Sequence, residues 1–163
     1  GSTDIIEGGV NDSYSVVLNS EPTANVTIAF NTGTQVAAIT SLTFTSGNWN
    51  TAQTVTVTAV NDAVAEGAHT QSITHSATSA DANYNGIGIG SVTANIIDND
   101  TAGVTITQSG GSTNITEGGA TDTYTVVLTS EPTANVTIAF NTGTQVSAIT
   151  SLTFTSGNWN TAQ

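Results

Sequence analysis

The chain has 163 residues and a formal net charge of −12 at pH 7, because it contains twelve Asp or Glu and no Lys or Arg. Nucleic acid is therefore excluded as a partner, since phosphate binding requires Lys or Arg to displace counterions, and attraction to an anionic membrane surface fails for the same reason. The lack of Cys rules out disulfides and thiolate zinc sites. No apolar run reaches the ~20 residues that span a bilayer, so membrane insertion is not expected.

Short runs of alternating apolar and polar residues predict β-strands throughout the first hundred residues. Gly, Asn and Asp punctuate these runs, and no stretch shows helical periodicity. Seven short strands separated by turns predict an all-β fold, a seven-stranded antiparallel β-sandwich of the immunoglobulin-like class. In chain order the strands are expected around Ile5 and Ile6 and over residues 13–18, 24–30, 39–45, 54–60, 69–77 and 90–97.

An internal repeat sets the expected domain organisation. Residues 1–53 recur at 111–163, an offset of 110, with eight differing positions. Self-similarity at this period indicates a tandem array of sandwich-sized domains of about 110 residues and not a solenoid. We expect residues 1–100 to form one repeat that lacks the first part of its first strand. Residues 101–163 are expected to form the first four strands of a second repeat, so that the chain is a segment of a longer array.

The acidic run Asp98-Asn99-Asp100 stands at the end of the seventh predicted strand, just before the second repeat. In an antiparallel fold the strand ends alternate between two poles. The run should therefore share its pole with the loops that carry Glu7 and the segment 61–67. Without Lys or Arg, clustered carboxylates must be solvated, protonated or neutralised by a metal ion.

Oxygen donors from three loops favour a calcium site at this pole. Ca²⁺ takes six to eight oxygen ligands, and carboxylates suit it well. The two histidines, His69 and His75, are expected on the sixth strand away from the acidic pole, which argues for calcium over a transition metal. The alternative is that these Asp and Asn residues only make turns and caps in solvated loops. Convergence of three loops favours the metal.

Four motifs together resemble the Calx-beta domain, a calcium-binding β-sandwich known from the regulatory region of the sodium–calcium exchanger and from large bacterial surface proteins. The motifs are Glu7-Gly-Gly, Tyr14-x-Val-x-Leu, Asn61-Asp62-x-x-x-Glu66-Gly67 and Ile96-Ile-Asp98-Asn99-Asp100. The resemblance covers the first repeat and the second as far as it extends. It implies that metal ligands stand at Glu7, Asp62, Glu66, Asp98 and Asp100, with Asn99 in a position that is often Asp.

Two departures from the Calx-beta pattern imply one or two structural ions and not a multi-ion sensor site. The segment 61–67 begins with Asn61-Asp62 where the family has two acids, and the loop at residues 31–34 offers no carboxylate. In the second repeat only Glu117 and Asp122 are present, so its site is expected to be incomplete.

A second, weaker metal candidate is the sequence Asp81-Ala-Asn83-Tyr-Asn85-Gly, which matches the first half of an EF-hand calcium loop. The bidentate Glu expected at position 12 of such a loop is replaced by Val92, and no helical pattern flanks it. An Asx-rich turn is the favoured interpretation.

Enzymatic activity is not expected, because no nucleophile motif or ordered triad accompanies the histidines. Trp49 and Trp159, at equivalent positions of the repeat, could form a sugar platform, but sealing of the sandwich end is favoured. We therefore expect a non-catalytic structural repeat of a secreted or cell-surface protein, in a filament, sheath, stalk or adhesin spacer, made rigid by Ca²⁺ at the repeat junction. Its expected partners are neighbouring repeats, with self-association into fibres. A carbohydrate-binding adhesive module and a regulatory calcium sensor are the alternatives.

Overall fold

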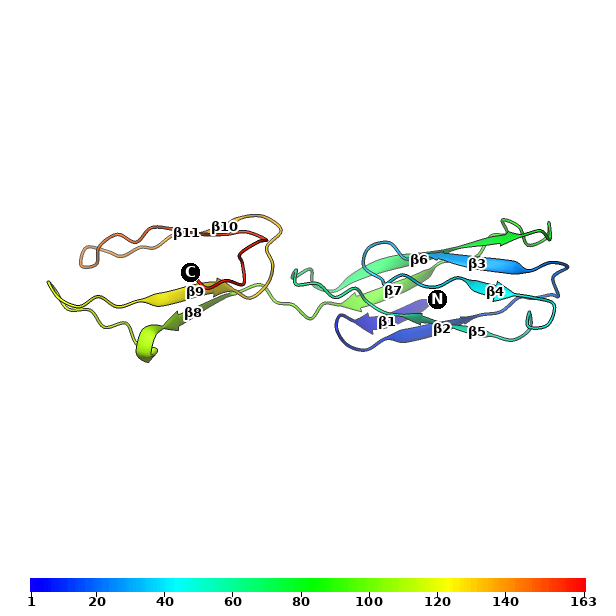
Figure 1. The fold of residues 1–163 in the computed structure, drawn as a ribbon, viewed down its shortest axis with the longest axis horizontal. Helices are drawn as coiled ribbons and strands as arrows, with labels where there is room; N and C mark the ends of the chain where they lie inside the picture. Colours follow the sequence, from blue (N-terminus) through cyan, green and yellow to red (C-terminus); the bar gives the residue numbers. More distant parts are fainter. The chain divides into compact units, whose positions relative to one another are not determined.

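The computed structural model describes all residues, 1–163. The protein has an all-β fold (Figure 1). The chain divides into two compact units, one made of Gly1–Asp62 and Gly67–Asn99 and the other of Ala63–Glu66 and Asp100–Gln163. The strands of the first unit are β1 Ser2–Ile6, β2 Asp12–Val16, β3 Val26–Asn31, β4 Leu42–Phe44, β5 Gln53–Val57, β6 His69–Ser79 and β7 Val92–Ile97. The second unit contains β8 Val104–Gln108, the 3₁₀ turn η1 Ser109–Gly111, β9 Tyr124–Leu128, β10 Val136–Ile138 and β11 Leu152–Phe154.

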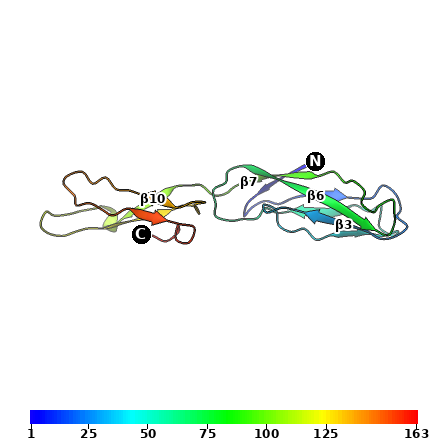
Figure 2. The same ribbon diagram turned by 90° about the horizontal axis from the view of Figure 1, so that it is seen from above.

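The first unit is β-sandwich-like, with one five-stranded sheet of order β1-β7-β6-β3-β4 and one two-stranded sheet made of β2 and β5. Figure 2 shows β7, β6 and β3 side by side in the larger sheet. Each of the seven strands expected from the alternating pattern is present, with ends shifted by a few residues. The period-2 pattern therefore located the strands correctly, because each has one face toward the interior.

Strand β1 departs from the expected antiparallel arrangement. It pairs in parallel with β7, in a register that sets Ile5 opposite Ile96, whereas β7–β6, β6–β3, β3–β4 and β2–β5 are antiparallel. Parallel strands need a long crossover, and here the whole chain from β2 to β6 provides it. The first and last strands of the unit thus run in the same direction and end beside each other.

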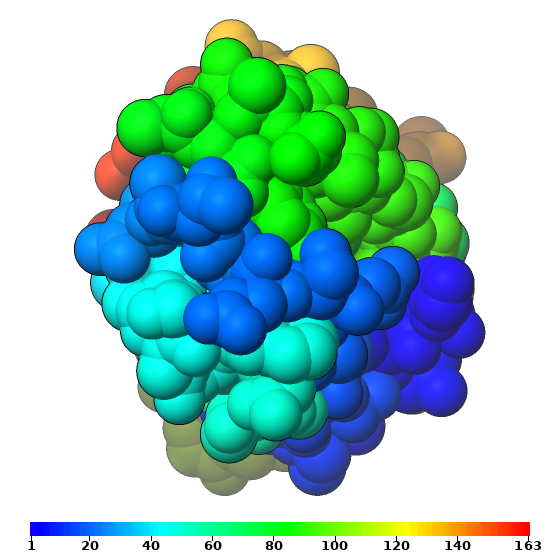
Figure 3. All heavy atoms as spheres, turned by 90° about the vertical axis from the view of Figure 1, so that its right-hand side faces the viewer, coloured from blue at the N-terminus to red at the C-terminus, as the bar shows by residue number.

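The core of the first unit lies between the two sheets. Val57 of β5 packs with Ile73 of β6 and Ile96 of β7, and all three side chains are buried. A second cluster around Phe44 fills the opposite half of the interior, beneath the partly buried ring of Trp49. Figure 3 looks onto this end of the unit, where three loops, coloured blue, cyan and green, cover it.

In the second unit β8 pairs with β9 and β10 pairs with β11, both antiparallel. The small core consists of Val126, Leu128 and Phe154. The turn that follows β11 repeats the one that follows β4: in each, an Asn side chain accepts the N–H of a Thr three residues earlier at 2.6 Å, Asn48 from Thr45 and Asn158 from Thr155. Identical turn sequences thus fold identically in both units.

His75 of β6 connects the two sheets of the first unit. Its Nε2 lies 2.8 Å from the hydroxyl of Tyr14 on β2, and its ring packs edge-on against Tyr14 and Phe30, with centroid distances of 5.8 and 5.3 Å. Burial lowers the pKa of His75 below its ordinary value, so the folded unit favours the neutral imidazole.

This pKa shift predicts a pH-dependent contribution of His75 to stability. Below the unfolded-state pKa of about 6.5, the unfolded chain binds a proton that the folded chain resists, so the free energy of unfolding falls as pH drops through this range. His75→Gln removes that contribution and keeps a polar partner for Tyr14. We expect the wild type to lose more stability between pH 7.5 and pH 5.5 than His75→Gln does, measured by urea unfolding followed by Trp49 fluorescence.

A Trp159→Phe background in both proteins confines this signal to the first unit. Backbone N–H donors also lower the pKa values of Asp12 and Asp81. Both proteins contain these two residues, so their contributions to the pH dependence of stability cancel when the proteins are compared. Equal pH dependence of the two proteins would show that His75 does not contribute.

Candidate metal centre

Glu7 is the buried acidic residue around which the candidate centre is built. It follows directly after β1, and its backbone N–H donates to the carbonyl of Ile97 at the end of β7 (3.0 Å). This bond places the carboxylate at the end of the sheet with only 2% of the residue exposed. A carboxylate is costly to bury unless a positive group or a proton neutralises it.

His69 lies beside Glu7, contrary to the expectation that both histidines stand away from the acidic pole. Its Nε2 is 4.0 Å from Glu7 Oε1. Its Nδ1 is 2.8 Å from the carbonyl oxygen of Gly67, which can only accept, so Nδ1 carries the hydrogen. The expectation for His69 was wrong because this residue is the first of β6, and β6 begins at the acidic pole.

Asp98, the residue after β7, brings a second carboxylate to the same place. The ligand oxygens of Asp98 and Glu7 lie within 4.8 Å of each other. Asp98 Oδ2 accepts the backbone N–H of Gly67 (2.7 Å), and the side-chain amide of Asn99 donates to Asn61 Oδ1 (2.8 Å). These two hydrogen bonds tie both ends of the segment 61–67 to the end of β7.

The other predicted ligands stand close along the chain. Asp62 is exposed in the first unit. Glu66 and Asp100 belong to the second unit, yet a peptide bond joins Glu66 to Gly67 and Asp100 to Asn99. Of the six predicted ligands, the first unit brings together Glu7, Asp98 and Asn99. The remaining three are Asp62, Glu66 and Asp100. Sequence reasoning missed His69, although its position two residues after Gly67 is the signal that could have found it.

The donor set fits more than one cation. Carboxylate and amide oxygens suit hard ions such as Ca²⁺, whereas an imidazole nitrogen suits borderline metals such as Zn²⁺. A hydrogen bond from Nδ1–H to a carbonyl oxygen is also the usual way in which a metal-binding His is oriented to present Nε2.

The equivalent residues of the second unit are arranged differently. Glu117, the counterpart of Glu7, is exposed. Asp122 accepts the backbone N–H groups of Asn114 (2.8 Å) and Thr123 (2.7 Å), and these bonds, Asn114 first, lower the pKa of its carboxyl group. Asp122 therefore holds a turn, and the two residues do not form a cluster with each other.

The weaker candidate at Asp81, Asn83 and Asn85 has the geometry of an anchored turn. The two carboxylate oxygens of Asp81 accept the backbone N–H groups of Thr23 (2.8 Å) and Asn83 (2.9 Å), which lower the pKa of this carboxyl group. Asn85 Oδ1 accepts the N–H of Ser79 (3.3 Å). These bonds pin the β6–β7 connection to the β2–β3 loop, a structural role that accounts for the sequence pattern.

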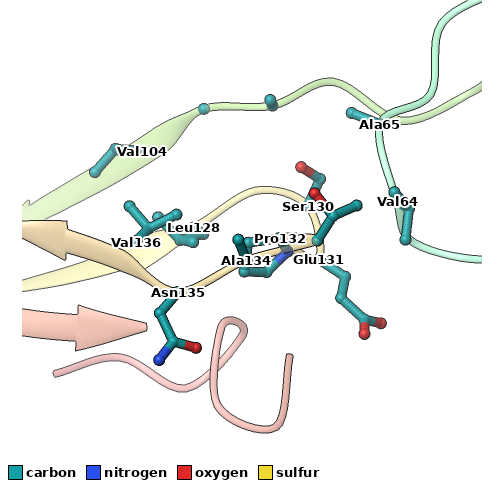
Figure 4. A pocket seen from close by; sticks show the side chains of 13 residues that line it. Val64, Ala65, Val104, Leu128, Ser130, Glu131, Pro132, Ala134, Asn135 and Val136 are labelled. Carbon is teal, nitrogen blue, oxygen red and sulfur yellow. The ribbon is translucent and has the colours of Figure 1, made fainter. Parts of the chain in front are cut away.

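One hollow of the second unit has a volume of about 580 Å³ and is lined mainly by apolar side chains (Figure 4). Val104, Leu128 and Val136 line one side, and Val64 lies on the other. The carboxylate of Glu131 points away from Leu128 and Val136 in Figure 4. Because Glu131 is the one titratable residue in its lining, the hollow has no paired acid and base of the kind that catalysis uses.

No protein-family model matches this sequence, and no curated protein is significantly similar to it. The structure contains no helix with the length and hydropathy of a membrane-spanning segment.

Gly8 is the residue on which the tie between Asn61 and Asn99 depends. It has a φ of +60°, and a Cβ at this position would lie 2.6 Å from Asn61 Oδ1 and 3.0 Å from Asn99 Nδ2. Gly118, its counterpart in the second unit, has a nearly equal φ of +66°, and a Cβ there would meet no atom within 4 Å. Comparison of an alanine substitution at Gly8 with one at Gly118 therefore separates two costs of adding a Cβ. One is the cost of a left-handed backbone conformation, and the other is the cost of a steric clash.

We therefore expect Gly8→Ala to destabilise the first unit by more than Gly118→Ala destabilises the second. Both variants lose about 1–2 kcal/mol from the left-handed conformation, and only Gly8→Ala also displaces Asn61. Urea midpoints measured through Trp49 for the first unit and Trp159 for the second provide the comparison. Equal losses would contradict a close approach of Asn61 and Asn99 to Gly8.

Proposed function

We propose that this chain is a non-catalytic structural segment of a secreted or cell-surface protein, built from tandem Calx-beta-like sandwiches and made rigid by Ca²⁺ at the repeat junction. The observation that carries the proposal is the buried carboxylate of Glu7 beside Asp98, in a chain without Lys or Arg. Such a group requires neutralisation, and a divalent cation held by oxygen ligands provides it.

The relation between the two units supports a tandem array of sandwiches about 110 residues apart. Residues 111–163 repeat the sequence of 1–53, and β11 occupies the position of β4 with an offset of 110. Gln163 exchanges both backbone hydrogen bonds with Val126, as Gln53 pairs with Val16 in the first unit. On this proposal each repeat is a seven-stranded sandwich, and the second unit belongs to the repeat that follows the first.

Glu7 and Asp98 are the predicted ligands that the first unit brings together, with carboxylate oxygens within 4.8 Å of each other. On this proposal, an ion held between them fixes the end of β7, from which the chain continues into the next repeat. The ion would be held by Glu7, Asp62, Glu66, Asp98, Asn99 and Asp100.

The charge of the carboxylates determines under which conditions such an ion binds. Without a cation, the carboxylates at the end of β7 repel one another. Bound Ca²⁺ supplies positive charge that removes this repulsion and adds stability by mass action. Acid would weaken binding, because carboxylate protonation removes the ligands. An extracellular location fits a structural ion, since millimolar calcium keeps sites of modest affinity filled.

The test compares thermal unfolding of the full chain in EDTA and in millimolar CaCl₂. A ligand at a hundredfold excess over its Kd adds about 2.7 kcal/mol, which corresponds to a rise in Tm of several degrees for a unit of this size. We expect Glu7→Gln to abolish the rise. The exposed counterpart Glu117→Gln is the matched control and should preserve it.

An unchanged Tm in calcium would refute the proposed function. Stabilisation by Zn²⁺ but not by Ca²⁺, lost in His69→Gln, would instead assign the site to an imidazole-binding metal and would also contradict the calcium proposal. MgCl₂ at the same concentration controls for general screening of the negative charge, which any divalent salt produces.

A further inference from the structure

Strand β4 is the last strand of the five-stranded sheet, so one of its two edges is not paired with another strand. Such an edge presents backbone N–H and C=O groups that can pair with a strand of another chain. Near-identical repeats increase this hazard, because every unit and every copy of the chain offers the same edge. The way in which the edge groups of β4 are satisfied therefore decides whether copies of this protein can associate through their sheets.

Gln53 covers this edge from the smaller sheet. Its backbone is fixed in β5 by pairing with Val16. Its side-chain amide donates to the carbonyl oxygen of Thr43, the middle residue of β4, at 2.9 Å. Because the donor does not belong to β3, this carbonyl points to the outer side of β4. A group that a neighbouring strand would bind is thus already bonded, and the bond connects the two sheets at their edges.

Asn48 covers the same edge from the turn that follows β4. Its Nδ2 lies 3.4 Å from the carbonyl oxygen of Thr43, and its Oδ1 accepts the backbone N–H of Thr45 at 2.6 Å. These two backbone groups flank Phe44, so one side-chain amide bonds the strand on both sides of that residue, as the peptide groups of an added parallel strand would. The backbone of Asn48 is held in place, since its N–H donates to the carbonyl of Thr45 (3.2 Å) and its carbonyl accepts the N–H of Thr51 (2.9 Å).

The second unit has the same arrangement on β11. Gln163 Nε2 donates to the carbonyl oxygen of Thr153 at 3.1 Å, and Asn158 Nδ2 lies 3.4 Å from the same oxygen. Asn158 Oδ1 accepts the N–H of Thr155 at 2.6 Å. Residues 152–163 have the same sequence as residues 42–53. Each unit thus carries its own side-chain donors for this edge.

We propose that the side-chain amides of Asn48 and Gln53 form a cap that closes the outer edge of β4 to pairing with a second copy of this chain, with Asn158 and Gln163 as the same cap on β11. Edge-to-edge pairing has to break these hydrogen bonds in both copies before it can form new ones, so the net gain from pairing is small. The cap keeps near-identical units from joining through their sheets.

The cap does not depend on the calcium site. Neither amide is charged, and both lie on β4, β5 and the turn between them, away from Glu7 and Asp98 in the sequence. Failure of the calcium test therefore leaves this proposal standing.

The first experiment removes the cap from the first unit of the full chain. Gln53→Met keeps the length of the side chain but has no donor, whereas Gln53→Lys restores a donor for the carbonyl of Thr43. We expect self-association of Gln53→Met, measured by sedimentation equilibrium, to be about tenfold or more stronger than that of the wild type, because the cap no longer competes in either copy. Gln53→Lys should behave like the wild type.

Gln108→Met, the same exchange at an exposed position of β8, is the matched control and should not associate more strongly than the wild type. Urea unfolding followed by Trp49 fluorescence verifies that each variant is folded under the conditions of the sedimentation measurement.

Disulfide trapping identifies the contact, because the chain contains no Cys of its own. Antiparallel pairing of two β4 edges about a two-fold axis brings their middle residues together. Thr43→Cys in the Gln53→Met background should therefore form cross-linked dimers, about tenfold or more than Thr43→Cys alone. Ser72→Cys, exposed on the central strand β6 of the same sheet, should not cross-link in either background.

Three results would overturn the proposal. One is a folded Gln53→Met variant that associates no more than the wild type at about 0.5 mM, a concentration that detects dissociation constants up to about the millimolar range. Another is association of Gln53→Lys as strong as that of Gln53→Met, because the lost donor would not be the cause. The third is equal cross-linking of Thr43→Cys with and without Gln53, because the edge would then be open in the wild type.

Discussion

The constraint on which this protein depends is electrostatic: it has twelve Asp or Glu side chains and no Lys or Arg, yet it buries two of them, Glu7 and Asp81. Asp81 is stabilised by backbone N–H donors, whereas Glu7 lies beside a second carboxylate, Asp98. Glu7 sits at the end of the sheet because its backbone N–H bonds to Ile97, so the backbone positions the carboxylate regardless of its cost. In most proteins a Lys or Arg would neutralise such a group. Here neither residue is present, and the proposed neutralising group is a cation from solution.

The two units contain near-identical sequences in different surroundings. Comparing them separates the effects of local sequence from those of tertiary structure. The turns at Thr45 and Thr155 have the same hydrogen bonds in both units because four neighbouring residues determine them. Glu7 and Glu117, each followed by two glycines, differ completely in burial. The strand β7 that receives the Glu7 N–H has no counterpart in the second unit. Burial of this carboxylate is therefore a property of the assembled sheet and not of the motif.

The calcium proposal follows from this buried charge at the end of β7. The first unit brings the carboxylate oxygens of Glu7 and Asp98 within 4.8 Å of each other. Like charges at this separation are unfavourable unless a cation lies between them.

Alternation of apolar residues was sufficient to locate all seven strands of the first unit, because a half-buried strand requires a period of two whatever its neighbours are. It was also sufficient to place Glu7 and Asp98 at one pole, since strand ends alternate. The parallel pairing of β1 with β7 and the approach of His69 to Glu7 were decided only by the folded chain. Strand direction at a sheet edge and distances between side chains depend on contacts between residues far apart in sequence, and no local pattern encodes them.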